Sequence, residues 1–202
     1  GRLDPGTRAL LAAPLSPSPR EGGGGGSPNG ASPPGAPTLP SPEGGGKQRA
    51  AEGGCATGPR RVLDLGCGVG VVGLVAALRR PEAQVTLVDS NARAVQCAAE
   101  NVAAHGLAAR CRVVLTAHAE SELEPGFDLV LTNPPYFGNY SIAERFLETA
   151  RRLLVPGGRF AVVTKAADWF RDAMQARFGN VALDPRGGYA VLTSIQPEAS
   201  PR

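Results

Sequence analysis

Apolar runs and helix-like segments alternate along the chain from residue 59, and this alternation limits the possible fold more than any other feature of the sequence. The apolar runs are short and rich in Val and Leu, as expected for buried strands. Strands that alternate with helices at this spacing form a parallel sheet covered on both faces, with right-handed crossovers. The sequence therefore predicts an α/β fold, a Rossmann-like, doubly wound, mostly parallel sheet of seven strands.

The predicted elements follow one another closely. Strands are predicted at residues 61–65, 84–89, 112–116, 127–132, 159–164, 181–183 and 189–195, and helices at 71–79, 91–105, 141–154 and 167–178. The run Pro156-Gly157-Gly158 is predicted to end the helix at 141–154. The last two strands are predicted to form a C-terminal antiparallel pair joined by Pro185-Arg186-Gly187-Gly188.

The first part of the chain has a different composition. Most of the excess of Gly (27 residues) and Pro (19 residues) lies before residue 60. Residues 14–58 cannot bury enough apolar surface to offset their ordering entropy, which predicts a disordered insertion; composition alone does not separate a genuine insertion from a sequence artefact. Residues 1–13, with a helix at 3–13, are assigned to the domain that continues at 59–196, and residues 197–202 to a tail.

Charge and cysteine content argue against a globally basic RNA-binding surface and against a metal site. The net charge is +3, and after residue 60 the chain holds 15 Lys or Arg against 14 Asp or Glu, so any RNA contact must use local patches. Cys55, Cys67, Cys97 and Cys111 form no CxxC pair, and only two histidines occur, which predicts reduced thiols and no metal. No apolar run approaches the ~20 residues of a membrane span, so a cytoplasmic protein is expected.

A glycine-rich loop, Asp64-Leu65-Gly66-Cys67-Gly68-Val69-Gly70, follows the first strand of this region and opens a helix. Two ligands fit such a loop. The overlapping run Gly68-Val69-Gly70-Val71-Val72-Gly73 matches the dinucleotide fingerprint. S-adenosylmethionine is the favoured ligand, because the carboxylate of Asp64 suits an amino group better than a pyrophosphate. Asp89 at the end of the next strand can hold ribose hydroxyls in either case.

The segment Asn133-Pro134-Pro135-Tyr136 follows the predicted strand at 127–132. An amide side chain, rigid backbone carbonyls and a flat ring at one point suit a planar NH2 group. Asn133 and the Pro134 carbonyl can each accept one N–H, while Pro135 fixes the backbone and Tyr136 stacks on the substrate. The pattern favours transfer of a methyl group to nitrogen over a plain strand-ending turn.

Residues 59–196 resemble class I S-adenosylmethionine-dependent methyltransferases of the small-domain group, and within it the small-subunit ribosomal RNA guanine-N(2) methyltransferases. The resemblance is carried by the loop Asp64–Gly70, the segment Asn133–Tyr136, and two outer segments at residues 3–11 and 187–192. The family joins its first segment to the loop by a few residues, whereas residues 14–58 intervene here. The family also often has Phe where this chain has Tyr136.

The resemblance, together with the patterns above, assigns site residues. The residues expected to bind the cofactor are Asp64, Gly66, Gly68, Gly70, Asp89, Ser90, His118, Ala119 and Asn133. The residues expected to carry catalysis are Asn133, Pro134, Pro135 and Tyr136, and those expected to contact the substrate are Tyr136, Phe137 and Lys165. Arg145, Arg151, Arg152, Arg171 and Arg177 are candidate RNA contacts, and the acidic run from Glu120 to Glu124 is expected to be a solvated face.

The resemblance implies an enzyme that methylates guanine N(2) in RNA of the small ribosomal subunit. A methyltransferase for a protein glutamine amide, as in release-factor-modifying relatives, is an alternative because an amide NH2 has the same geometry. An adenine-directed RNA methyltransferase is another, since Phe137 occurs in such relatives. A third possibility is a non-catalytic RNA-binding module, against which the intact loop, Asp89 and Asn133 argue.

Overall fold

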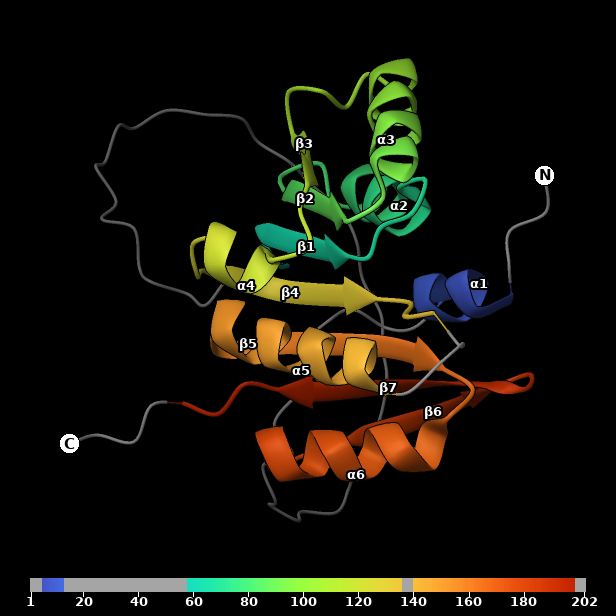
Figure 1. Ribbon diagram of the computed structural model, residues 1–202, viewed down its shortest axis with the longest axis vertical. Helices are drawn as coiled ribbons and strands as arrows, with labels where there is room; N and C mark the ends of the chain where they lie inside the picture. Colours follow the sequence, from blue (N-terminus) through green and yellow to red (C-terminus); the bar gives the residue numbers. More distant parts are fainter. Residues whose placement is uncertain (1–4, 13–57, 136–139, 199–202) are drawn as a thin grey trace, which may run out of the picture. The chain divides into compact units, whose positions relative to one another are not determined.

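The computed structural model describes residues 5–12, 58–135 and 140–198 (Figure 1). Its helices are α1 (Pro5–Ala12), α2 (Val71–Arg79), α3 (Ala92–Ala104), α4 (Ala119–Glu122), α5 (Ser141–Leu153) and α6 (Ala167–Phe178). Its strands are β1 (Arg61–Leu65), β2 (Gln84–Asp89), β3 (Cys111–Leu115), β4 (Phe127–Thr132), β5 (Leu154–Thr164), β6 (Ala182–Arg186) and β7 (Tyr189–Ile195). Residues 13–57, which hold almost all of the predicted insertion, lie outside the described residues.

The seven strands form one sheet in the order β3-β2-β1-β4-β5-β7-β6. β1 to β5 pair in parallel, while β7 runs antiparallel to both β5 and β6. A dinucleotide-binding domain has the order 3-2-1-4-5-6, whereas here an antiparallel β7 is inserted next to β5. The predicted fold class, including the C-terminal antiparallel pair, is confirmed.

Each face of the sheet has its own apolar core because neighbouring residues of a strand point to opposite faces. In β4, Leu129 and Leu131 contact the core on the side of α1, α2 and α3. Val130 contacts the core on the side of α4, α5 and α6. These strand residues are at most 1% exposed, so the sheet is covered on both sides as a parallel sheet requires.

Local sequence explains where the helices begin. α2 follows Gly70, whose backbone is left-handed (φ 87°), a conformation that glycine adopts without steric cost. α3 begins after Asn91, whose side-chain oxygen accepts hydrogen bonds from the backbone N–H groups of Arg93 and Ala94. Both helix starts therefore lie directly after loops at the carboxyl ends of β1 and β2.

The predicted boundary between α5 and β5 was wrong. The strand begins at Leu154, directly after the helix, and Pro156-Gly157-Gly158 lies inside the strand at a break in register between Phe127 and Leu129 of β4. Pro and Gly stop helices, but they also occur at β-bulges, where a ladder hydrogen bond is missing. The strand predicted at residues 181–183 was also too short. β6 extends to Arg186, and Pro185 pairs with Ala190 within it.

None of the helices in the described residues is long and apolar enough to cross a membrane. Three of the four cysteines lie in this part of the chain, and Cys67, Cys97 and Cys111 are all free thiols. Across residues 5–12, 58–135 and 140–198, no three His, Cys, Asp or Glu side chains gather in a way that could hold a metal ion.

Candidate active site

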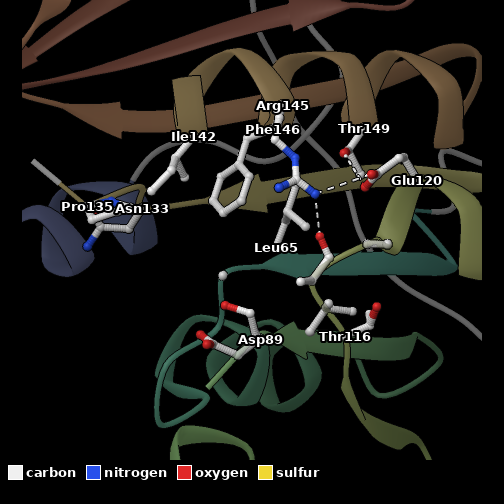
Figure 2. Close-up of a pocket in the computed structure, with 15 residues that line it drawn as sticks. Leu65, Asp89, Thr116, Glu120, Asn133, Pro135, Ile142, Arg145, Phe146 and Thr149 are labelled. Atoms are coloured by element: carbon white, nitrogen blue, oxygen red, sulfur yellow. Dashed lines mark hydrogen bonds and ion pairs between the residues drawn. The ribbon is translucent and has the colours of Figure 1, made fainter. Parts of the chain in front are cut away.

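A cavity of about 450 Å³ opens at the carboxyl ends of β1, β2, β3 and β4 (Figure 2). This is the switch point of the sheet, because β1 has β2 on one side and β4 on the other. Ligands of open α/β sheets bind at such a point. The cavity is lined by Leu65, Gly66, Val88, Asp89, Ser90, Thr116, Ala117, Ala119, Glu120, Asn133, Pro135, Ile142, Arg145, Phe146 and Thr149.

The backbone N–H groups of the glycine loop are largely used within the protein. Those of Gly66 and Cys67 both donate to the Val88 carbonyl, at 2.9 and 2.8 Å, and that of Gly70 donates to the Cys67 carbonyl. The loop is therefore tied to β2 by its own backbone.

Asp89 joins the glycine loop to the rim of the cavity. Its Oδ2 accepts a hydrogen bond from Gly68 N at 2.8 Å, and its Oδ1 accepts one from Asn91 N at 2.9 Å. The side chain also lines the cavity, with Ser90 next to it. A carboxylate has about four acceptor positions, so both oxygens can also accept from the hydroxyls of a ligand.

Asp64 lies below the loop and does not line the cavity. It is 1% exposed, and its Oδ2 accepts a hydrogen bond from Gly73 N at 2.7 Å. Burial raises the pKa of this carboxyl to about 7, although the hydrogen bond from Gly73 opposes the shift. The structure thus shows Asp64 holding α2 against β1, and its predicted contact with the amino group of a cofactor stays a prediction.

The segment after β4 brings the amide of Asn133 to the cavity. Thr132 Oγ1 donates to the Leu65 carbonyl at 2.8 Å, which fixes the ends of β4 and β1 together. Asn133 is half-buried and Pro135 is exposed, and both line the cavity, whereas Pro134 is buried and does not. Tyr136 and Phe137 lie outside the described residues.

One wall of the cavity joins α5 to the segment after β3. Arg145 Nη2 donates to the Ala117 carbonyl and to Glu120 Oε1, and Thr149 Oγ1 donates to Glu120 Oε2 (Figure 2). Partial burial raises the pKa of Glu120, but its own backbone N–H and Arg145 outweigh this effect and lower it below the ordinary value. Glu120 is therefore part of the cavity wall, which corrects its predicted place on a solvated face, whereas Glu122 and Glu124 of the same run are exposed as predicted.

Several predicted residues lie elsewhere. Gly68 and Gly70 belong to the glycine loop but do not line the cavity. His118 does not line it either, and its side chain is 64% exposed. Lys165 Nζ lies over the ring of Tyr189, 5.0 Å from its centroid.

Three of the candidate RNA-binding arginines already pair with acids of their own helix or a neighbouring one. Arg145 pairs with Glu120, Arg171 with Asp168 and Asp172, and Arg177 with Glu148. Of the five arginines proposed for RNA, Arg145 is the one that lines the cavity.

Apart from Arg145, the side chains that α5 contributes to the cavity were not predicted as site residues from the sequence. Phe146 lines the cavity, and its ring lies next to Gly66, since a Cβ on that glycine would lie 2.9 Å from Phe146 Cε2. Ile142 and Thr149 line the cavity from the same helix. Their spacing of three and four residues was the signal available, because it places them on one side of a helix.

Three comparisons with known proteins agree with this geometry. Residues 56–193 match the family model described as methyltransferase small domain. The chain is 34% identical to the ribosomal RNA small subunit methyltransferase C of Hahella chejuensis, over 61% of this chain and 36% of that protein. It is 43% identical to the ribosomal RNA large subunit methyltransferase G of Ectopseudomonas mendocina, over 52% of this chain and 29% of that protein.

Among solved structures, the fold is similar to a T. thermophilus 16S rRNA N2 methyltransferase (RsmC) in complex with AdoMet and guanosine. The TM-score is 0.61 at 27% identity, over 68% of this chain and 37% of that one. The chain spans about a third of the length of the curated relatives it matches. The match to the family model extends over more than half of the chain, and the sheet order and the cavity are consistent with it. The chain belongs to the methyltransferase small domain family.

Proposed function

We propose that this chain transfers a methyl group from S-adenosylmethionine to an exocyclic amine of a nucleic-acid base, and specifically to guanine N(2) in RNA of the small ribosomal subunit. The observation that carries the proposal is one cavity lined by both Asp89, at the end of β2, and Asn133, at the end of β4. The first suits the ribose of a nucleoside cofactor, and the second suits an NH2 group. The catalytic unit is proposed to be residues 59–196 with residues 1–13.

The residues present fit S-adenosylmethionine. The cavity of about 450 Å³ falls in the range of small-molecule sites, which is about 300–1,000 Å³. Asp89 would hold the ribose hydroxyls, with Ser90 beside it, and Gly66 would allow close approach at the loop. When bound, this cofactor supplies an electrophilic methyl group on a sulfonium.

Asn133 and the backbone after it would orient the acceptor amine. Its side-chain oxygen would accept one N–H of the substrate, and the Pro134 carbonyl would accept the other. Two acceptors favour a pyramidal nitrogen with its lone pair toward the methyl group, and these hydrogen bonds strengthen as the nitrogen gains positive charge. Pro135 limits backbone motion at this point. The methylated nitrogen is acidic and loses its proton to solvent, so no strong base is needed.

Ribosomal RNA is the proposed substrate because relatives at 34% and 43% identity are named as methyltransferases of the small and of the large ribosomal subunit RNA. The solved RsmC complex contains guanosine, which supports guanine as the base. The small subunit is proposed from the resemblance of the outer segments at residues 3–11 and 187–192. A base within a duplex would have to be flipped into the cavity.

The experiment is transfer of a labelled methyl group to small-subunit particles, large-subunit particles and purified release factor, followed by nucleoside analysis. N(2)-methylguanosine from the small subunit is the expected product. Label on large-subunit RNA or on adenosine would overturn the proposed substrate, and label on the release factor would indicate the glutamine alternative. Absence of label on every substrate would contradict the proposed enzyme activity.

A further inference from the structure

The side chain of Asn133 is held from a distant part of the sequence. Its Nδ2 donates a hydrogen bond to Thr7 Oγ1 at 3.3 Å, across 126 residues of chain. Thr7 lies on α1, the short helix before the predicted insertion, and Figure 2 shows the Asn133 nitrogen on the side of this helix. α1 therefore reaches the edge of the cavity at the residue expected to contact the acceptor amine.

The position of Thr7 is fixed by packing. The next turn of α1 places Ala9 and Leu10 in the core shared with α2 and α3, where they are 6% and 1% exposed. Thr7 itself is 8% exposed, so its hydroxyl cannot move far from the amide. A buried, well-packed acceptor holds its partner more firmly than a surface side chain or water does.

The direction of the Asn133 amide decides what the cavity can bind. A carboxamide has a donor NH2 on one side and an acceptor oxygen on the other, and a rotation of 180° exchanges them. An acceptor for a substrate NH2 requires the oxygen toward the cavity. A hydrogen bond from Nδ2 to Thr7 turns the NH2 toward α1 and so favours that orientation.

We propose that Thr7 is a positioning residue for Asn133, which selects the amide orientation in which the oxygen faces the acceptor amine. The inference rests on the proposed function, since it gives Asn133 the role of accepting a substrate N–H. Through Thr7, α1 favours a substrate group that donates hydrogen bonds over one that only accepts them. Thr7 acts through Asn133 and need not touch the substrate.

The test uses Thr7→Val, which keeps the shape and removes the acceptor, and Thr7→Ser, which restores it. Thr86→Val, on β2, is the matched control for the loss of a hydroxyl elsewhere in the fold. Loss of one hydrogen bond is expected to lower kcat about fivefold to tenfold in Thr7→Val, with the Kd for S-adenosylmethionine unchanged. Thr7→Ser and Thr86→Val should retain the wild-type kcat.

A second readout does not depend on activity. In ¹⁵N-labelled wild-type protein, the side-chain NH2 signals of Asn133 are assigned by their loss in Asn133→Ala. They should show a nuclear Overhauser effect to the Thr7 γ-methyl group. In Thr7→Val their chemical shift and water-exchange rate should change, and in Thr7→Ser they should remain close to wild type.

The two readouts separate this inference from the proposed function. A wild-type protein without methyl transfer, but with the Overhauser effect and the shift change, would overturn the function and leave the Thr7–Asn133 contact established. Absence of the Overhauser effect in the wild type would overturn the inference. Equal kcat in Thr7→Val and wild type, or a failure of Thr7→Ser to restore kcat, would overturn it too.

Discussion

Gly66→Ala should weaken cofactor binding as well as the fold. Gly66 has a left-handed backbone (φ +72°), and a Cβ there would lie 2.9 Å from Phe146 Cε2. Left-handed backbone in a residue other than glycine costs about 1–2 kcal/mol. The clash is with the far end of one side chain, so the Phe146 ring can shift at small further cost. That ring lines the cavity, so its shift changes the shape of the wall against which the cofactor would pack.

The magnitude follows from the lost contacts. A gap of about 0.5–1 Å removes a quarter to a half of each dispersion contact. We therefore expect a Kd for S-adenosylmethionine about tenfold higher, which is about 1.4 kcal/mol. Gly106→Ala is the matched control, because Gly106 is also left-handed (φ +66°) but a Cβ there meets no atom within 4 Å. It should lose about 1–2 kcal/mol of stability and keep the wild-type Kd.

The assays are urea unfolding for stability and calorimetry for cofactor binding. A double variant, Gly66→Ala with Phe146→Leu, should recover part of the binding, because the smaller side chain leaves room for the new methyl group. The cycle of single and double variants isolates this contact. A Kd in Gly66→Ala no higher than in Gly106→Ala would refute the reasoning that Gly66 and Phe146 together shape a cofactor site.

Three further predictions concern single side chains. Asp89→Asn should raise the cofactor Kd at least about tenfold in calorimetry. Asp128→Asn is the control and should not raise it, because Asp128 also accepts from two backbone N–H groups but lies outside the cavity. Equal Kd values in the two variants would contradict the role of Asp89. The pKa of Asp64 is raised from 3.8 to about 7, so the proton it retains in the folded state stabilises the fold at low pH, and this stabilisation is lost as pH rises from about 4 to 7. Asp64→Asn should flatten that fall in urea unfolding measured across this pH range, and an unchanged slope would count against the burial effect. Phe160→Ala should lower the free energy of unfolding by about 3–5 kcal/mol, since the ring is fully buried, and a loss below about 1 kcal/mol would show that the core is packed differently.

The sheet could be predicted from the sequence because its strands are buried on both faces. Val62 to Leu65 and Leu129 to Leu131 read as continuous apolar runs, with Asp64 as the one polar exception, and such runs occur in parallel sheets. The start of β5 could not be predicted, because Pro156-Gly157-Gly158 has the same residues whether it ends a helix or forms a bulge. α4 has only four residues and no apolar period, so its sequence gave no signal.

The lining of the cavity was predictable where one short segment supplies it, as at Gly66 and Asn133. The cavity wall of Arg145 and Glu120 was not, because the two residues are 25 positions apart and either charge alone is typical of a solvated surface. The contact between Thr7 and Asn133 depends on how α1 packs against the sheet. Such long-range pairs follow from tertiary packing and not from local pattern.

The most direct test of the central claim is a calorimetric titration of this chain with S-adenosylmethionine, and with NAD for comparison. The sheet order, with an antiparallel β7 next to β5, and the match to the methyltransferase small domain family predict saturable binding of S-adenosylmethionine and no binding of NAD. Binding of NAD, or no binding of S-adenosylmethionine, would contradict the account.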